Sequence, residues 1–310
     1  MREKEPVASR RVLLLAHPAG HSLSPAMHTA GFRALGIDAS YEALDVPPEA
    51  LPGAVRALRG SEFLGANVTV PHKRAVAGLV DDLDTEARAI GAVNTIVKDE
   101  GRLVGRNTDA PGFLAALRET GFAPAGHRCL VLGAGGAARA VTWALMRSGA
   151  EVLVANRSEN RARDLAADLG TAGAVATAPR WLPNRDVAAS LPGCDLLVNT
   201  TSVGMAGGPA PDGDPLPEGA DVRALPTAAV VVDLVYRPGV TPLLARAEAA
   251  GLRRQNGVAM LVWQGALAFE AWTGRDAPVV AMRRAVEGAL AQDERAAAEG
   301  DGRATARDER

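Results

Sequence analysis

The stretch Arg128-Cys-Leu-Val-Leu-Gly-Ala-Gly-Gly-Ala-Ala138 decides the fold, because it joins a buried strand pattern to a turn of small residues. A helical pattern follows at residues 139–148, and a second strand pattern at residues 151–155 comes at the distance that a strand-helix-strand unit requires. The spacing G-x-G-x-x-A is the dinucleotide fingerprint, in which small residues let the backbone approach a pyrophosphate at a helix N-terminus. A tight turn without a ligand is the alternative, but this context favours a Rossmann-like cofactor domain.

The residues after the second strand indicate which dinucleotide binds. An NAD site needs an acidic residue at this strand end, about 20 residues beyond the glycines, to bind the ribose hydroxyls. The chain instead has Asn156-Arg157-Ser158, followed by Arg161. Guanidinium groups match the oxygens of a phosphate, and no carboxylate stands at the strand end to repel one. We therefore expect NADP, with a solvated basic helix start as the alternative.

The composition sets bounds on size and partners. The 310 residues are 47% apolar with mean hydropathy near zero, which suffices for the cores of two ordinary domains. Lys and Arg number 34 against 36 Asp and Glu, so the chain lacks a broad basic field for nucleic acid. The longest apolar runs, such as residues 12–16 and 228–232, are far shorter than the roughly 20 residues of a membrane-spanning helix. We expect neither nucleic acid nor a membrane as a partner.

Two cysteines and the N-terminal residues predict the compartment. Cys129 and Cys194 lie in apolar, strand-like stretches, without metal-ligand spacing or a disulfide framework. The first residues, Met1-Arg-Glu-Lys-Glu-Pro6, contain no apolar signal-peptide core. We therefore expect a reduced, cytoplasmic protein without a metal site.

Strand-like and helical patterns alternate along most of the chain, which favours a parallel α/β architecture. Further strands are expected at residues 11–16, 41–46, 64–70, 95–98, 103–105, 195–199 and 230–234. Ser24 predicts the cap of a helix that Pro25 opens, and Pro71 predicts the start of the next short helix. The loop at residues 204–226 has no periodicity and is either a loop near a site or an insertion. The charged tail from residue 292 is expected to be disordered.

Polar residues collect at the ends of the expected strands in the first third of the chain. They are Ser22 and Ser24, Asn67 and Thr69, Asn94 and Thr95, and Asn107 with Asp109. Ligands bind at the carboxyl ends of strands in open α/β sheets, so these groups predict a site for a polyhydroxylated, anionic small molecule. Serine hydroxyls at a helix start can bind a carboxylate, although an ordinary cap is the alternative for Ser24.

Lys73 stands out because the chain uses arginine for nearly all its basic residues, and only three lysines, Lys4, Lys73 and Lys98, occur among the 34. A lysine at a strand end indicates a group that can exchange its proton, which arginine effectively cannot. With Asp109 to hold the ammonium in place, Lys73 could protonate an oxygen as hydride arrives at the adjacent carbon. An ordinary surface lysine is the alternative.

With these residues in place, the chain resembles the shikimate dehydrogenase family, NADP-dependent oxidoreductases that reduce 3-dehydroshikimate to shikimate. The resemblance runs from residue 12 to about residue 290 in the family's order. Its motifs are Ser22-Leu-Ser-Pro25, Asn67-Val-Thr-Val-Pro-His-Lys73, Gly91-Ala-Val-Asn-Thr95, Asn107-Thr-Asp109, the glycine turn, Asn156-Arg-Ser158, Asn199-Thr-Thr-Ser-Val-Gly-Met205, Asp233-Leu-Val-Tyr236, Asn256-Gly257 and Met260-Leu-Val-Trp-Gln264.

The resemblance implies a role for each matching residue. Lys73 and Asp109 are the implied catalytic pair. The implied substrate-binding residues are Ser22 and Ser24 with Tyr236 at the carboxylate, and Thr69, Asn94, Asp109 and Gln264 at the ring hydroxyls. The implied cofactor-binding residues are Gly133, Ala134, Gly135, Gly136 and Ala137 at the pyrophosphate, Asn156, Arg157, Ser158 and Arg161 at the 2′-phosphate, Gly257 and Met260 on the nicotinamide side, and Asp81 facing the cleft.

The resemblance also implies the division of the chain. Residues 1–110 would form an N-terminal α/β substrate-binding domain that residues 257–291 complete, and residues 111–256 a Rossmann-like NADP-binding domain. Hydride would pass across the cleft between them. The expected partners are a small-molecule substrate, shikimate or 3-dehydroshikimate, and a second copy of the chain in a homodimer.

Three departures from the family pattern leave the substrate open. Ala110 and Asn256 replace a usual glycine and a common aspartate, and Arg106 adds a cation beside the substrate cluster. Quinate or aminoshikimate dehydrogenase is the alternative within the same chemistry. A non-catalytic, cofactor-binding regulatory paralogue is the alternative from another class, and the intact pair of Lys73 and Asp109 argues against it.

Overall fold

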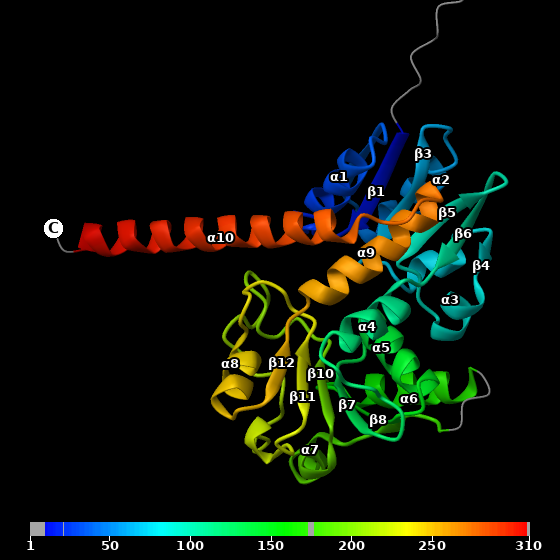
Figure 1. Ribbon diagram of the computed structural model, residues 1–310. Coiled ribbons are helices and arrows are strands. Elements are labelled where there is room, and N and C mark those ends of the chain that lie inside the picture. The colour runs from blue at the N-terminus through cyan, green and yellow to red at the C-terminus, as the bar shows by residue number, and fades with distance from the viewer. Residues whose placement is uncertain (1–9, 21, 173–176, 309–310) are drawn as a thin grey trace, which may run out of the picture.

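Two six-stranded sheets organise the chain. The computed structural model describes residues 10–20, 22–172 and 177–308, and the two sheets lie one above the other in Figure 1, joined by helices in the middle. Sheet A is built from the first third of the chain and sheet B from the middle. The predicted α/β class with two domains of this kind is confirmed.

Sheet A has the order β2-β1-β3-β5-β6-β4. Its strands are β1 (Arg10–Ala16), β2 (Ala39–Asp45), β3 (Phe63–Val68), β4 (Asp82–Leu83), β5 (Thr95–Asp99) and β6 (Arg102–Arg106). The pairs β1–β2, β1–β3 and β4–β6 are parallel, whereas β5 runs antiparallel to both β3 and β6. The expectation of a parallel sheet is therefore wrong for this half of the chain.

Sheet B is parallel throughout, with the order β12-β11-β10-β7-β8-β9. Its strands are β7 (Arg128–Leu132), β8 (Glu151–Ala155), β9 (Arg180–Trp181), β10 (Leu196–Asn199), β11 (Val230–Asp233) and β12 (Arg253–Gln255). The helices between these strands are α5 (Gly136–Arg147), α6 (Glu159–Thr171), α7 (Asn184–Ser190) and α8 (Pro242–Ala249). Burial on both faces explains why β7, β8, β10 and β11 read as continuous apolar runs.

Two C-terminal helices return to sheet A. Helices α9 (Val258–Thr273) and α10 (Val279–Asp308) pack with α1 (Ser24–Ala34), as Figure 1 shows. Val262, Phe269 and Trp272 of α9 share one core with strand residues of sheet A, and the Trp272 Nε1–H donates to the Ile96 carbonyl oxygen at 3.0 Å. The last strand of sheet B is thus followed at once by a helix of the other half.

The remaining helices complete the two halves. Helix α4 (Asp109–Arg118) packs against both α5 and α9, where the two halves meet. The shorter elements are α2 (Leu51–Ala57), α3 (Thr85–Ile90), and the 3-10 turns η1 (Pro48–Ala50), η2 (Ala75–Gly78), η3 (Leu191–Gly193) and η4 (Val222–Ala224). Apart from η4, the loop at residues 204–226 contains no regular element, in line with its lack of periodicity.

Three local expectations differ from the structure. Ser24 is the first residue of α1 rather than its cap, and its N–H donates to the Ser22 Oγ at 3.2 Å. Pro71 does not open a helix, since the next helical turn begins at Ala75. The tail from residue 292 continues α10 to Asp308 instead of being disordered. Its many alanine, glutamate and arginine residues have high helix propensity, which explains the extension.

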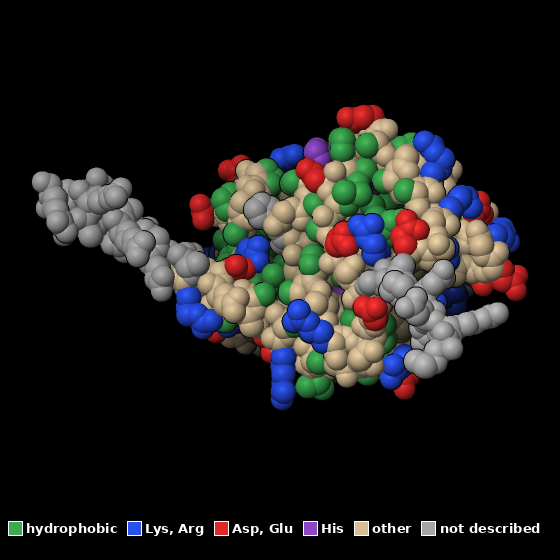
Figure 2. All heavy atoms as spheres, turned by 90° about the horizontal axis from the view of Figure 1, so that it is seen from above, with side chains coloured by type: hydrophobic (Ala, Val, Ile, Leu, Met, Phe, Trp, Pro, Cys, Tyr) green, Lys and Arg blue, Asp and Glu red, His purple; other side chains and the backbone are tan. Residues whose placement is uncertain are grey.

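The surface and the cysteines are consistent with the composition. Charges of both signs are interspersed over the face in Figure 2, with no large area of one sign. None of the helices that the structure describes is long and apolar enough to cross a membrane. Cys129 and Cys194 are free and buried, and burial raises the pKa of the Cys194 thiol to about 11.

Candidate active site

A buried ion pair lies where sheet A meets α4. Lys73, which follows β3, places its Nζ 2.6 Å from the Oδ2 of Asp109, the first residue of α4. The two side chains are 15% and 4% exposed, so water screens the pair little. The Asn94 Nδ2–H donates to the other oxygen of Asp109 at 2.9 Å. Both carboxylate oxygens are therefore engaged, and the Lys73 ammonium is fixed.

Asn94 connects this pair to two further elements. Its Nδ2 lies 2.9 Å from the Thr108 Oγ1 and 3.2 Å from the Gln264 Oε1, and its Oδ1 accepts from the Thr108 N–H at 2.7 Å. Gln264 lies on α9, 170 residues further along the chain. The structure thus brings Lys73, Asn94, Asp109 and Gln264 into one cluster.

Asn67 belongs to the same cluster, although it is absent from the residues to which the sequence assigned roles. It lies at the end of β3, is 5% exposed, and its Nδ2 donates to the Asn94 carbonyl oxygen at 3.1 Å. The Tyr41 hydroxyl donates to its Oδ1 at 2.8 Å. The sequence places Asn67 among the polar residues at strand ends but assigns it no individual role, and the burial of its amide requires the partners found here. Thr69, two residues on, is half-buried.

The two serines lie beside this network. The Ser24 side chain lies near the Tyr41 hydroxyl, from which hydrogen bonds run through Asn67 and Asn94 to Asp109. Tyr236, after β11 in the other half, packs against the sheet A core that contains Leu23, the residue between the serines. Burial raises the pKa of the Tyr236 hydroxyl, and the charge of Arg237 and the Leu23 contact oppose that shift. A residue that follows β11 of sheet B thus lies close to the start of α1, which packs on sheet A.

We expect Tyr41→Phe to lower the free energy of unfolding by about 1–3 kcal/mol, because it leaves the buried Asn67 amide without its hydroxyl donor. The ring, stacked on His28 at 4.4 Å between centroids, is kept. Urea unfolding measures the change. Ser40→Ala, on the same strand, is the control: its hydroxyl bonds the exposed Glu42, so the change should stay within about 0.5 kcal/mol. A Tyr41→Phe effect no larger than that of the control would contradict the expectation.

The glycine turn lies against Lys73. Gly133 has φ +119°, and a Cβ there would stand 2.3 Å from the Thr200 Oγ1, so only glycine fits. A Cβ on Gly136, the first residue of α5, would stand 3.1 Å from the Cβ of Lys73. At Gly135 a Cβ would meet nothing within 4 Å, so the turn faces open space. Ala134 and Ala137 flank these glycines and are half-buried.

Two arginines after β8 are available to bind an anion. Arg157 and Arg161 are exposed, and neither forms an ion pair or a side-chain hydrogen bond within the part of the chain that the structure describes. The nearby Glu159 carboxylate accepts from the Asn184 N–H at 2.9 Å instead. The Asn156 Nδ2–H donates to the Ser158 carbonyl oxygen at 2.9 Å and holds the strand end in a turn.

Gly257 and Met260 lie at the connection between sheet B and α9. The Gly257 N–H donates to the Val235 carbonyl oxygen at 3.0 Å, and a Cβ on Gly257 would stand 2.0 Å from the Leu234 carbonyl oxygen. Met260 is 8% exposed and packs in the core that sheet B shares with α4 and α5. Both residues therefore lie where the two halves meet.

Asp81 lies elsewhere, so the expectation that it faces the cleft disagrees with the structure. Its carboxylate pairs with the Arg59 guanidinium at 2.7 and 2.8 Å and accepts from the Leu103 N–H at 2.8 Å. These contacts, led by that of Arg59, lower the pKa of Asp81 to about 2. Leu103 is near the start of β6 and Asn107 follows its end, roughly 13 Å further along at about 3.3 Å per residue.

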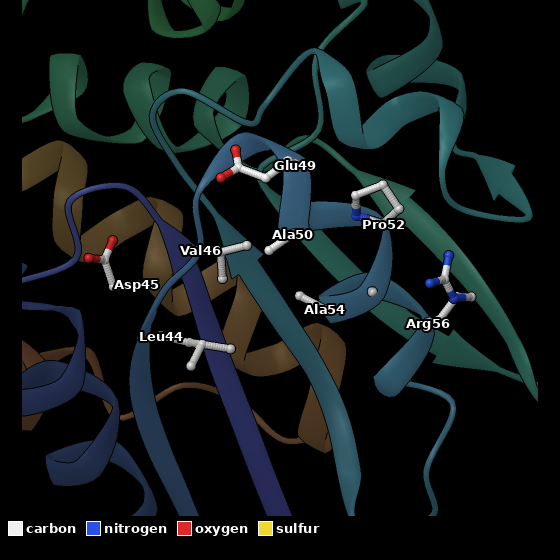
Figure 3. Close-up of a pocket in the computed structure, with 9 residues that line it drawn as sticks. Leu44, Asp45, Val46, Glu49, Ala50, Pro52, Ala54 and Arg56 are labelled. Atoms are coloured by element: carbon white, nitrogen blue, oxygen red, sulfur yellow. The ribbon is translucent and has the colours of Figure 1, made fainter.

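A separate hollow lies beside β2, an edge strand of sheet A. It has a volume of about 480 Å³ and lies between the end of β2 and the segment η1–α2, where Leu44, Glu49 and Arg56 line it (Figure 3). None of the catalytic, substrate-binding or cofactor-binding residues predicted from the sequence lines it. Among the residues that the structure describes, no three His, Cys, Asp or Glu side chains are grouped so that they could hold a metal ion.

A Rossmann-like nucleotide fold whose glycine turn meets a buried lysine–carboxylate pair defines a pyridine-nucleotide-dependent oxidoreductase. Family models match three segments: the shikimate dehydrogenase substrate binding domain at residues 14–96, shikimate / quinate 5-dehydrogenase at residues 116–203, and the shikimate 5′-dehydrogenase C-terminal domain at residues 257–287. The chain belongs to the shikimate dehydrogenase family.

Individual relatives agree with the family models. The shikimate dehydrogenase (NADP(+)) of Methanopyrus kandleri is 49% identical over 275 residues, which cover 88% of this chain and 93% of the relative. The shikimate 5-dehydrogenase of Thermus thermophilus, solved with NADP(H) and shikimate, is 46% identical with a TM-score of 0.79, covering 91% of this chain and all of that one. The quinate dehydrogenase of Corynebacterium glutamicum, solved with NAD, is 31% identical with a TM-score of 0.81, covering 90% and 99%.

Proposed function

We propose that the chain is an NADP-dependent shikimate dehydrogenase that interconverts 3-dehydroshikimate and shikimate in chorismate and aromatic amino acid biosynthesis. The observation that carries the proposal is the buried pair of Lys73 and Asp109, 2.6 Å apart, against the glycine turn at Gly136. A proton donor thus stands beside the place where a dinucleotide's pyrophosphate fits. NADP is the cofactor expected for this family.

Lys73 supplies the proton in this proposal. NADPH held at the glycine turn would supply the hydride that the ketone carbon takes up. The Lys73 ammonium donates its proton to the ketone oxygen, so the carbonyl becomes a hydroxyl and the lysine becomes neutral. Asp109 holds the ammonium in place and stabilises its charge. In the reverse direction the neutral amine takes the proton from the substrate hydroxyl as hydride leaves.

The other polar residues orient the substrate. Ser22, Ser24 and Tyr236 bind its carboxylate, since the serines stand at the start of α1 and Tyr236 packs against the core that contains Leu23 between them. Thr69, Asn94, Asp109 and Gln264 bind the ring hydroxyls, and the amides supply both donors and acceptors. We add Asn67 to this group because its amide lies in the same network.

The chain's own residues fit an NADP molecule. Gly133, Ala134, Gly135, Gly136 and Ala137 border the open space at the start of α5, where backbone N–H groups favour a pyrophosphate. The guanidinium groups of Arg157 and Arg161, which have no partner among the described residues, suit a 2′-phosphate together with Asn156 and Ser158. Gly257 and Met260 border the nicotinamide. Asp81 is left out because of its contacts with Arg59 and Leu103.

Three broader expectations belong to the same proposal. The substrate domain comprises residues 1–110 and 257–291 and the cofactor domain residues 111–256, which the return of α9 to sheet A supports. The buried free thiols of Cys129 and Cys194 suit a reducing cytoplasm. The protein forms a homodimer, which light scattering during gel filtration would test.

Steady-state kinetics with shikimate, quinate and aminoshikimate, each with NADP and with NAD, tests the function. The highest kcat/KM is expected with shikimate and NADP. A preference for quinate or aminoshikimate would reassign the substrate, for which the added cation of Arg106 beside the cluster is the structural argument. Inactivity with all three substrates would favour a regulatory paralogue.

A further inference from the structure

A buried carboxylate ties together three segments at the end of sheet B. Asp233, the last residue of β11, is 0% exposed. Its Oδ1 accepts from the Asn199 Nδ2–H at 2.9 Å and the Val235 N–H at 3.0 Å. Its Oδ2 accepts from the Thr241 hydroxyl at 2.7 Å, and Thr241 caps α8. The carboxylate therefore fixes both ends of the segment 234–241 and joins it to β10.

That segment carries one of the contacts between the two halves of the chain. Tyr236 lies within it and packs against the sheet A core that contains Leu23, the residue between the two serines. The neighbouring Val235 accepts from the Gly257 N–H at 3.0 Å, at the start of α9. The side chain at position 233 thus acts at the base of the segment that places Tyr236.

None of the ion pairs among the described residues involves the Asp233 carboxylate, and no charged group is among the causes of its pKa shift. Burial raises the pKa of Asp233 to about 6, against the opposing effect of its three hydrogen bonds. Arg237 on its own segment contacts Asp293, and Arg246 on α8 pairs with Asp214. Burying a carboxylate without an ion pair costs stability. Three hydrogen-bond donors compensate for the burial of Asp233, which indicates that the carboxylate serves to hold these donors in place.

We infer that Asp233 is a positioning residue that holds the segment 234–241 so that Tyr236 meets the substrate carboxylate beside Ser22 and Ser24. The inference rests on the proposed function. In this role Asp233 contacts neither substrate nor cofactor and acts through Tyr236. Its removal should therefore weaken substrate binding without slowing the chemical step.

Four variants test this on the full-length protein. Asp233→Asn and Thr241→Val each remove one bond of the carboxylate, and Thr241→Ser keeps the hydroxyl. We expect the first two to raise the shikimate KM about three- to tenfold, with kcat and the Kd for NADP changed less than twofold. Thr241→Ser should restore a normal KM. Asp221→Asn is the matched control, because Asp221 is half-buried and the hydrogen bonds of its carboxylate among the described residues all come from Arg223.

A double-mutant cycle with Tyr236→Phe separates positioning from general stability. If Asp233 acts through Tyr236, Asp233→Asn should add less than twofold to the KM in the Tyr236→Phe background. An unchanged KM in both Asp233→Asn and Thr241→Val, or the same fold-increase with and without the Tyr236 hydroxyl, would overturn the inference. If Asp233→Asn fails to fold, Thr241→Val and Thr241→Ser in the two backgrounds decide it.

The dependence on pH gives an independent readout. Protonation removes one acceptor from the Asp233 carboxylate, so the wild-type KM for shikimate should rise as the pH falls through about 6. The ratio of the Asp233→Asn KM to the wild-type KM should then fall toward one. A ratio that is constant with pH overturns the inference alone, whereas a wild type without shikimate turnover overturns the proposed function with it.

Discussion

Lys73→Ala should lower kcat with shikimate by about 10²–10⁴-fold, the contribution that a positioned proton donor makes. The shikimate KM should change little, because the lost interaction is made mainly in the transition state. The side chain is 15% exposed and its Nζ lies 2.6 Å from the Asp109 carboxylate, so bulk water has little access to take over its role. Steady-state kinetics in both directions measures the loss.

Lys73→Arg is the matched control for charge. It keeps a cation beside Asp109 but removes a group that can give up its proton near neutral pH. We expect kcat to remain low in this variant while the melting temperature stays close to that of the wild type. A kcat restored by arginine would mean that position 73 supplies only charge, and an unaltered kcat in Lys73→Ala would remove Lys73 from the chemistry.

Arg157→Ala should raise the KM for NADP about 10- to 100-fold, since a hydrogen bond between charged groups contributes roughly 1.5–3 kcal/mol. NAD lacks the 2′-phosphate, so the KM for NAD should change less than twofold. Arg157 is exposed and has no protein partner among the described residues, so its removal leaves no buried charge behind.

Arg163→Ala is the control for this variant, because Arg163 lies on α6, which begins two residues after Arg157, and its guanidinium stacks over the Trp181 ring at 4.2 Å. The KM values for both cofactors should be unaffected by that change. Equal losses of NADP and NAD affinity in Arg157→Ala would rule out recognition of the 2′-phosphate by this residue.

The parts of the fold that the sequence predicts well are those that bury continuous apolar strands. β7 and β8 have the predicted bounds, 128–132 and 151–155. The strands that escaped prediction, β4, β9 and β12, are only two or three residues long and lie at sheet edges or contain charged residues. Such strands are defined by their pairing partner rather than by their own pattern.

The sequence contains a local signal for the antiparallel pairing of β5 and β6 in sheet A, which the prediction of a parallel sheet did not use. β5 and β6 are separated by Glu100 and Gly101, both with positive φ, and two residues are far too few for a parallel crossover.

Some contacts of the active-site residues could be predicted from the sequence and others could not. Lys73 and Asp109 were predicted from chemistry and lie together, whereas the contacts of Asn67 and Asp81 depend on Tyr41 and Arg59, distant in sequence.

The return of α9 and α10 to sheet A has a consequence for synthesis of the chain. The strand residues Val12 and Leu14 share a core with Val262, Phe269 and Val286, which the ribosome makes more than 240 residues later. One apolar face of sheet A therefore stays uncovered during translation until sheet B and then α9 and α10 have been synthesised. Contacts this distant along the chain form slowly. The nascent N-terminal half is thus the segment most exposed to aggregation and most in need of a chaperone until translation is nearly complete.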